Sequence, residues 1–505
     1  MRVHTDFPRS PDPVGTVARH AQRHGTHTRY QGAGHAPASA RGVRCRCGCG
    51  GRRRAGRVRR DPRPGAGRGG RRRCRRNTRP SAGAAAPRNA EAREKQKGRG
   101  QDRPVGSASD PARPVPGAGG TADAAGESEG VADPVRKAYR QALREQREEL
   151  TVWWLDRMVA VKHPWEEKRT LLWHNHWATS IQKVKSGAAM LQQNETLRRL
   201  GGGDFRALAR AMVVDPALMV WLDAGGSTAK APNENLAREL MELFVLGVGN
   251  YTETDVRQAA AVLTGWTVDR SKNPWEARFR SRRHDPAPRT VVGVKAGFTA
   301  QTLVDHLVSL PDSHAHVAAR MWRALVSAEK GPDEAALGRV TAAYGKQRDS
   351  TAMFRALFTD AAFSDADNVL VKQPVEYVVG SLRALGVRPS ELPENVRRQV
   401  VIRTLSGLGQ VPFAPESVGG WPAGAAWLTT AAAQVRIGFA EALVRQADLS
   451  DVERASAGER PELLARKLGT GGWGDATRKA LAASAQDPRT VTAIALTAPE
   501  HLVLS

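Results

Sequence analysis

The chain has 505 residues, room for two or three ordinary domains, and a formal net charge of +26. Residues 1–130 hold 29 Lys and Arg against 10 Asp and Glu, a net of +19, so the rest of the chain carries only +7. No stretch approaches the ~20 consecutive apolar residues of a membrane helix, and no signal-peptide pattern is visible. The sequence as written predicts a cytoplasmic protein without a membrane partner; export stays open because the N-terminus is itself in question.

The first 130 residues show no folding pattern. Between residues 31 and 100 only Val43 and Val58 are large and apolar, so this basic segment cannot offset its chain entropy and is expected to be disordered. Its arginine runs would bind nucleic acid without specificity. Three interpretations stay open: a nucleic-acid-binding tail, a solvated linker, or the product of a frameshift or misplaced start in a GC-rich gene. We favour the third, because Arg, Gly, Ala and Pro all have GC-rich codons.

All four cysteines lie in this segment, at Cys45, Cys47, Cys49 and Cys74. The rest of the chain therefore uses neither disulfides nor thiolate chemistry, which fits a reducing compartment. A C-x-C-x-C run followed by one distant cysteine is not a zinc spacing.

From residue 135 onward the pattern is helical. Residues 134–162 are predicted to form one long helix, because Tyr139, Leu150 and Trp154 fall on one stripe. Pro164 is typical of a helix start, and the next helix is expected from Trp165 to about Ser180. Further helices are predicted at 204–213, 232–246, 252–265, 299–310, 312–328, 333–348, 372–386, 394–407, 424–448, 459–467 and 487–497.

One segment departs from this pattern. Residues 277–294, around His284-Asp285-Pro286, are predicted to form a short β-hairpin. No internal repeat is evident, so a solenoid is not expected. The sequence thus predicts a mainly α, multi-helix globular body over residues 131–500 with one short β-hairpin, preceded by a disordered basic segment over residues 1–130.

Three long segments carry a family resemblance. They are His163-Pro164, Glu167-Lys168 and WHNHWATS at 173–180; PNENLARELMELF at 232–244 with Gly247, Gly249, Tyr251 and LTGW at 263–266; and KQPVE at 372–376, GQVPF at 409–413 and GWP at 420–422. In this order, over about residues 150–430, the chain resembles the bacterial family catalogued as domain of unknown function 1800. The family normally opens with an apolar and basic helix, and here the arginine-rich stretch stands in its place.

The resemblance implies a largely helical fold and no established activity. It also implies that many members are exported. Genes of this family often lie beside genes of a sulfatase-like family, which implies a functional link to such a neighbouring protein.

Two histidines flank Asn175 in the first segment. His174 and His176 are two residues apart, which on a helix separates them by about 200° and puts them on opposite faces. They can share a metal only if the helix ends there, because the usual helical metal spacing is i, i+4. They are either polar residues beside a tryptophan cluster or groups that bind metal or transfer protons.

The second segment begins a helix with a polar stripe. Pro232 and Asn233 favour a helix start, and an apolar face runs through Leu236, Leu240, Leu243 and Phe244. The stripe at i, i+3, i+4 and i+7 consists of Asn235, Arg238, Glu239 and Glu242. Such a stripe can hold a cation, orient a water or bind a substrate. The alternative is a solvated face with Glu234–Arg238 and Arg238–Glu242 pairs.

Two hypotheses for function follow. The first is a metal-assisted hydrolase with His174, His176, Glu239 and His284 as catalytic candidates, Asn233, Asn235, Arg238 and Glu242 as substrate-binding candidates, and a divalent metal on His174, His176 and Glu239. The second is a non-enzymatic helical scaffold that binds a partner. Nucleic acid is expected to bind only through the basic segment. No G-x-S-x-G elbow, Walker loop or dinucleotide fingerprint occurs, which disfavours serine hydrolases and nucleotide-dependent enzymes.

Overall fold

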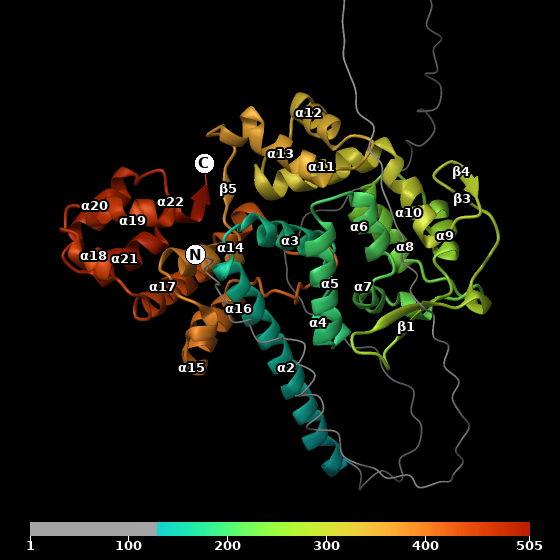
Figure 1. Cartoon of the computed structure of the whole chain (residues 1–505), viewed down its shortest axis with the longest axis horizontal. Coiled ribbons are helices and arrows are strands. Elements are labelled where there is room, and N and C mark those ends of the chain that lie inside the picture. Colours follow the sequence, from blue (N-terminus) through green and yellow to red (C-terminus); the bar gives the residue numbers. More distant parts are fainter. Residues whose placement is uncertain (1–128, 505) are drawn as a thin grey trace, which may run out of the picture. The chain divides into compact units, whose positions relative to one another are not determined.

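The computed structural model describes residues 129–504. They form a mainly helical body with three two-stranded sheets, as predicted for the fold class (Figure 1). The basic segment, apart from its last two residues, and its four cysteines lie outside the described residues. None of the helices between residues 129 and 504 is long and apolar enough to cross a bilayer.

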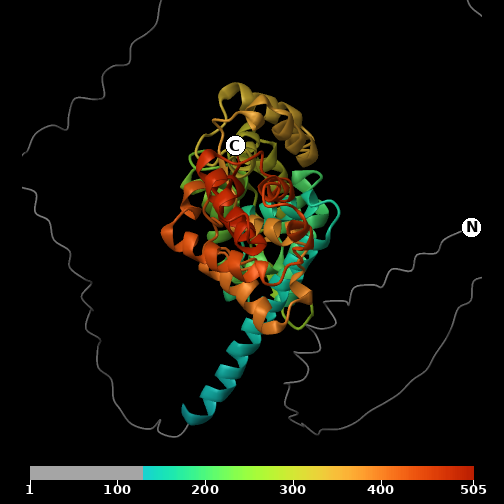
Figure 2. The ribbon, with the colours of Figure 1, turned by 90° about the vertical axis from the view of Figure 1, so that its left-hand side faces the viewer.

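The long N-terminal helix is confirmed as α2 (Glu129–Ala160). Leu150 and Trp154 from its predicted stripe are buried, whereas Tyr139, nearer its start, is 53% exposed. The N-terminal part of α2 projects away from the other helices (Figure 2). Only the second half of the apolar stripe therefore contributes to the core.

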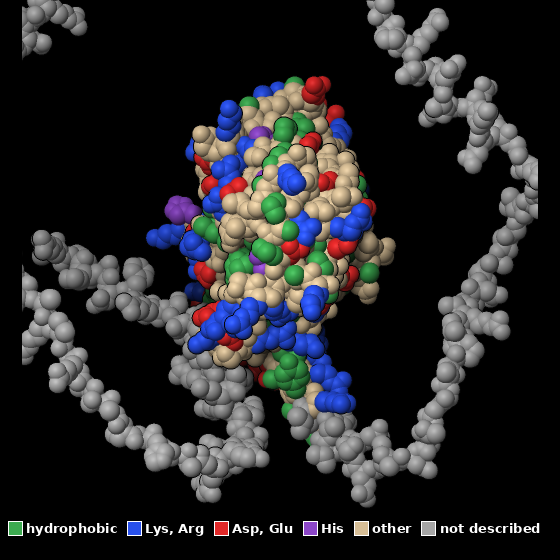
Figure 3. All heavy atoms as spheres, turned by 90° about the vertical axis from the view of Figure 1, so that its right-hand side faces the viewer, with side chains coloured by type: hydrophobic (Ala, Val, Ile, Leu, Met, Phe, Trp, Pro, Cys, Tyr) green, Lys and Arg blue, Asp and Glu red, His purple; other side chains and the backbone are tan. Residues whose placement is uncertain are grey.

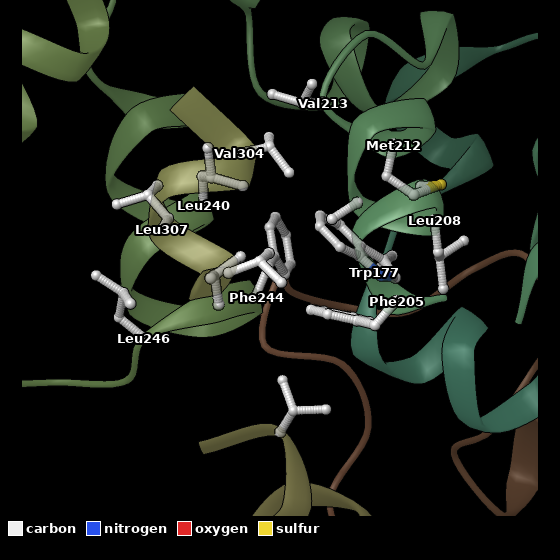
Figure 4. Packing of buried hydrophobic residues seen from close by; sticks show 14 of the residues in the cluster. Trp177, Phe205, Leu208, Met212, Val213, Leu240, Phe244, Leu246, Val304 and Leu307 are labelled. Atoms are coloured by element: carbon white, nitrogen blue, oxygen red, sulfur yellow. The ribbon is translucent and has the colours of Figure 1, made fainter. Parts of the chain in front are cut away.

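One hydrophobic cluster is centred on Trp177, Phe205 and Phe244, whose side chains lie close together in Figure 4. The Trp177 and Phe244 ring centroids are 4.4 Å apart. The elements around this first cluster are α3 (Trp165–His176), α5 (Gly187–Leu200), α6 (Phe205–Met212), α7 (Pro216–Trp221), α8 (Asn235–Glu239), the π-helix η2 (Leu240–Val245), α9 (Glu253–Val262), α10 (Ala300–Ser309), α11 (Pro311–Leu325), α12 (Glu334–Tyr344) and α13 (Ser350–Thr359).

A second hydrophobic cluster contains Trp154, Tyr377 and Phe413. Helices α3, α5 and α7 contribute to this cluster as well as to the first. Besides them and α2, the elements around it are α4 (Ile181–Val184), α14 (Pro374–Ala384), α15 (Glu394–Arg397), the π-helix η6 (Arg398–Arg403), α16 (Thr404–Gly407), α17 (Thr430–Val444), α18 (Ser450–Arg454), α19 (Arg460–Leu468), α20 (Asp475–Ala483), α21 (Pro488–Thr497) and α22 (Pro499–Leu502). Short 3-10 turns occur at η1 (Ala224–Gly226), η3 (Ser281–Arg283), η4 (Ala361–Ser364), η5 (Pro389–Glu391) and η7 (Gly424–Trp427).

The predicted helices are present, with corrected limits. The helix from Trp165 ends at His176 rather than near residue 180, and the one predicted at 424–448 begins at Thr430. The patterns at 232–246 and 394–407 each contain a π-helical segment, η2 and η6. Seven further helices lie outside the predicted ranges: α4, α5, α7, α13, α18, α20 and α22.

The sheets correct the predicted hairpin. Strand β2 (Glu276–Phe279) pairs with β1 (Trp266–Asp269), while β3 (Arg289–Val291) pairs with β4 (Val294–Ala296). The segment 277–294 therefore contributes strands to two hairpins instead of forming one, and β5 (Leu370–Val371) pairs with β6 (Val503–Leu504).

Local turns explain the two hairpins. Val292 and Gly293 both have positive φ, the requirement of the tight two-residue turn that closes β3 on β4. Gly265 has φ +89 and directs the chain from α9 straight into β1. Strands β2 and β3 therefore do not pair with each other: β2 pairs with the preceding β1, and β3 pairs with the following β4.

Candidate functional site

The two histidines of the WHNHW segment lie at the C-terminal end of α3. The helix ends at His176, and both imidazole side chains are buried, His174 at 1% and His176 at 2% exposure. The predicted separation onto opposite faces is confirmed. The ring of His174 contacts the second cluster through Trp154 and Phe413, whereas that of His176 contacts the first cluster.

His174 accepts a main-chain hydrogen bond. The Phe413 N–H donates to its Nε2 over 3.1 Å, so the ring proton is on Nδ1. That Nδ1 is buried and has no hydrogen-bond partner among the described residues. Burial lowers the pKa of His174 to about 3. The ring is therefore neutral at physiological pH.

His176 makes the opposite kind of bond. Its Nε2 lies 2.9 Å from the main-chain oxygen of Phe244 and must donate, because a carbonyl oxygen only accepts. Burial lowers its pKa well below the usual value, and the charge of Arg320 acts in the same direction. His316 on α11 bonds the adjacent oxygen of Leu243 at 2.9 Å. Two neutral imidazoles thus satisfy carbonyls that η2 leaves open at its C-terminus.

Asn175 connects the same turn to the third segment. Its Oδ1 accepts a hydrogen bond from the main-chain N–H of Trp421 at 2.8 Å. Gly420 has φ +87, and a Cβ at this position would lie 2.2 Å from that Oδ1. All three segments of the family resemblance therefore meet at the end of α3. Sequence reasoning missed the partners, because they are main-chain atoms.

The helix predicted at 232–246 begins at Asn235, three residues later than predicted. The Oδ1 of Asn233 accepts from the N–H of Asn235 at 2.8 Å, and its Nδ2 donates to the Asp223 oxygen at 3.1 Å. Asn233 is thus used to position the start of α8, while Asn235 is exposed. Leu236, Leu240 and Phe244 are buried, as the predicted apolar face requires.

Arg238 pairs with two carboxylates. One is Glu253 at 2.6 Å and the other Glu234 at 3.2 Å, which confirms the predicted Glu234 pair. The predicted pair with Glu242 is wrong. Arg238 is instead engaged by Glu253 on α9, and Glu242 accepts from the Tyr251 hydroxyl.

Glu239, the last residue of α8, and Glu242 in η2 are both partly exposed. The Glu239 carboxylate is half-buried and has no hydrogen bond or ion pair within residues 134–504. Burial raises its pKa, and the negative charge of Glu242 raises it further. Glu242 accepts from the Tyr251 hydroxyl at 2.8 Å. Burial and this bond raise the pKa of Tyr251 to about 12.

His284 lies elsewhere, in the link between the two hairpins. Its Nδ1 is 3.1 Å from the main-chain oxygen of Thr264, and the Thr264 hydroxyl accepts from the Asp285 N–H at 2.9 Å. Asp285 also pairs with Arg289. These hydrogen bonds hold the segment between the two hairpins against Thr264, two residues after the end of α9.

A comparison with known families places the chain. The family model described as "Protein of unknown function (DUF1800)" matches residues 62–503. The chain belongs to this family. No curated protein and no solved structure matches it. In this DUF1800 member the match begins inside the basic segment that the sequence analysis treated as separate from the body.

The described part of this DUF1800 member brings some predicted site residues together and separates others. The histidine turn at residues 174–176 and the helix at residues 235–245 do meet, through the hydrogen bond from His176 to the Phe244 main-chain oxygen and through contact of the two rings, but not through the predicted polar side chains. Nowhere in residues 134–504 do three or more His, Cys, Asp or Glu side chains form a group able to hold a metal. The two histidines and Glu239 thus do not form one ligand set. The group that remains for chemistry is Glu239, Glu242 and Tyr251.

Proposed function

We propose that this DUF1800 protein is a hydrolase whose acid–base centre is Glu239 and Glu242. The observation that supports it is the Glu239 carboxyl, which is half-buried, unpartnered and adjacent to a second carboxylate. Carboxyl groups whose pKa is raised in this way are frequent at active sites. A π-helical turn, which also occurs often at functional sites, carries Glu242.

The two carboxyls would divide the acid and base roles. Protonated Glu239 donates its proton to the leaving group, while Glu242, held by the Tyr251 hydroxyl, takes a proton from the attacking water. The water supplies the hydroxyl that replaces the leaving group. Asn235, exposed one turn before Glu239, is placed to bind a substrate polar group, whereas Arg238 is occupied by Glu253 and Glu234.

The residues do not fit a histidine-held metal. The Nε2 atoms of His174 and His176 are each engaged by a main-chain group, and the two rings lie in different hydrophobic clusters. No step of the proposed reaction therefore passes through a metal ion.

A substrate panel tests this proposal. The purified full chain would be assayed with chromogenic esters, phosphate esters and glycosides, beside Glu239→Gln and the control Glu195→Gln, whose exposed carboxylate pairs with Arg198. Turnover that Glu239→Gln abolishes and Glu195→Gln preserves is expected. No turnover across the panel, or equal turnover in both variants, would reject the proposal.

A second candidate function is a non-enzymatic scaffold that binds a partner. The observation that favours it is the turn at residues 174–176, in which all three side chains bond to distant main-chain atoms and join the two clusters. This candidate expects no turnover, and it expects Glu239→Gln to change partner capture without changing any catalytic rate.

A further inference from the structure

The β1–β2 hairpin holds much of the positive charge of the folded body. Residues 266–284 contain six Lys and Arg and two Asp and Glu, a net of +4. Residues 131–505 together carry only +7. More than half of the body's net charge therefore lies on one short ribbon and the turn that follows it.

The cations form groups at both ends of this ribbon. Arg270 and Lys272 occupy the loop between β1 and β2, and Arg280 and Arg282 follow the end of β2. Lys230 lies near the second group, because the Ala229 N–H donates to the Arg283 main-chain oxygen at 2.8 Å. A four-residue strand separates the groups by about 13 Å at ~3.3 Å per residue.

Four of these cations form no salt bridge within the described residues. Lys230, Lys272, Arg280 and Arg282 are exposed, and no ion pair engages their side chains in the described part of the chain. The other cations have partners: Arg278 pairs with Asp269 and Glu276, Arg270 lies over the Trp275 ring, and Arg283 donates to the Gly226 oxygen. Figure 3 shows the side of the molecule that lies on the right in Figure 1, where β1 is labelled. Many Lys and Arg side chains lie on the lower half of this face.

An exposed aromatic ring lies beside these cations. Phe279, directly before Arg280, is 47% exposed although its ring contacts Trp266 at 5.4 Å and His284 at 5.1 Å between centroids. These contacts fix the ring's position while leaving part of it open to solvent. A positioned, partly open aromatic ring beside unpaired cations is the combination that single-strand binders use.

We propose that this ribbon binds single-stranded nucleic acid. Phosphates contact Lys272 at one end and Lys230, Arg280 and Arg282 at the other, and a base stacks on Phe279. An acidic protein would also be attracted to these cations, but it has no bases to stack on the exposed Phe279 ring. This surface belongs to the folded body and is separate from the arginine-rich residues 1–130.

The test uses the full chain and a labelled 20-nucleotide oligo-uridine. Binding would be followed by fluorescence anisotropy at several salt concentrations for the wild type and for Arg280→Ala/Arg282→Ala. The control is Arg445→Ala/Arg454→Ala, which removes two exposed arginines beside the second cluster. The basic N-terminal residues are the same in all three proteins, so differences between them report the ribbon.

Loss of two phosphate contacts should reduce the slope of log affinity against log salt by about 1.4. Phe279→Ala should weaken binding at least roughly fivefold, and Lys272→Ala should lower the slope independently. The control should match the wild type. Equal slopes for the two double variants would overturn the proposal. The proposal would also be overturned if Phe279→Ala bound the oligonucleotide as tightly as the wild type and polyglutamate bound the ribbon equally strongly. That result would indicate an acidic protein partner.

Discussion

His176 donates its Nε2 hydrogen to the main-chain oxygen of Phe244, 68 residues along the chain. Its ring is buried among Trp173, Trp177 and Phe205. This bond makes the double-histidine turn a structural connection between α3 and η2.

Replacing His176 should destabilise the protein strongly. His176→Ala leaves the buried Phe244 oxygen without its donor and opens a cavity among the aromatic rings, for a combined loss of about 2–4 kcal/mol. His163→Ala removes an exposed histidine just before the same helix and is the matched control. Urea denaturation measures both. A His176→Ala midpoint close to that of the control would show that the bond contributes little.

His174 should make stability depend on pH. Its folded pKa of about 3 lies below the unfolded value near 6.5, so the unfolded state binds the proton more readily. The contribution of His174 to the free energy of unfolding is therefore complete above pH 6.5, and it is lost as the pH falls toward 3. His174→Gln keeps an acceptor for the Phe413 N–H but does not titrate. Between pH 7 and 5 it should lose about 2 kcal/mol less than the wild type.

Comparison of the two proteins at each pH cancels the other titrating groups, including His176 and the buried Asp215, whose pKa burial raises to about 6. Parallel curves for His174→Gln and the wild type would contradict a neutral, buried His174.

Gly420 should not tolerate a side chain. At φ +87, alanine is strained by about 1–2 kcal/mol, and its Cβ would meet Asn175 Oδ1 at 2.2 Å. Gly420→Ala should therefore lower the thermal midpoint by several degrees. Gly380→Ala, within α14 and with open space around its Cβ, should be neutral or raise the midpoint. The prediction fails if the two substitutions shift the midpoint equally.

Glu239→Gln should stabilise the protein at neutral pH. Because burial and Glu242 raise the folded pKa of Glu239, ionisation costs stability as the pH rises through that value. The amide avoids this cost and has nearly the same shape. A higher urea midpoint than wild type is expected at pH 7, with the difference shrinking at pH 4. A lower midpoint at pH 7 would mean that the charged carboxylate makes a favourable contact.

The sequence by itself determined many of the helices and, in several of them, which face a residue occupies. The 3.6-residue period identified α2 and α9, the i, i+2 spacing placed His174 and His176 on opposite faces, and Asn233 marked the start of α8. These features are local, because they depend on backbone geometry within a few turns and on side chains that the sequence names.

Only the tertiary structure decided what those side chains contact. The partner of His174 is the main-chain N–H of Phe413, 239 residues away, and the Arg238 partner missed by helix spacing is Glu253 on the next helix. Strand 276–279 likewise pairs with β1, which precedes it, and not with the later strand of the predicted hairpin. Nearly every residue has the same main-chain donor and acceptor, so no side-chain pattern marks which one a distant histidine will bind.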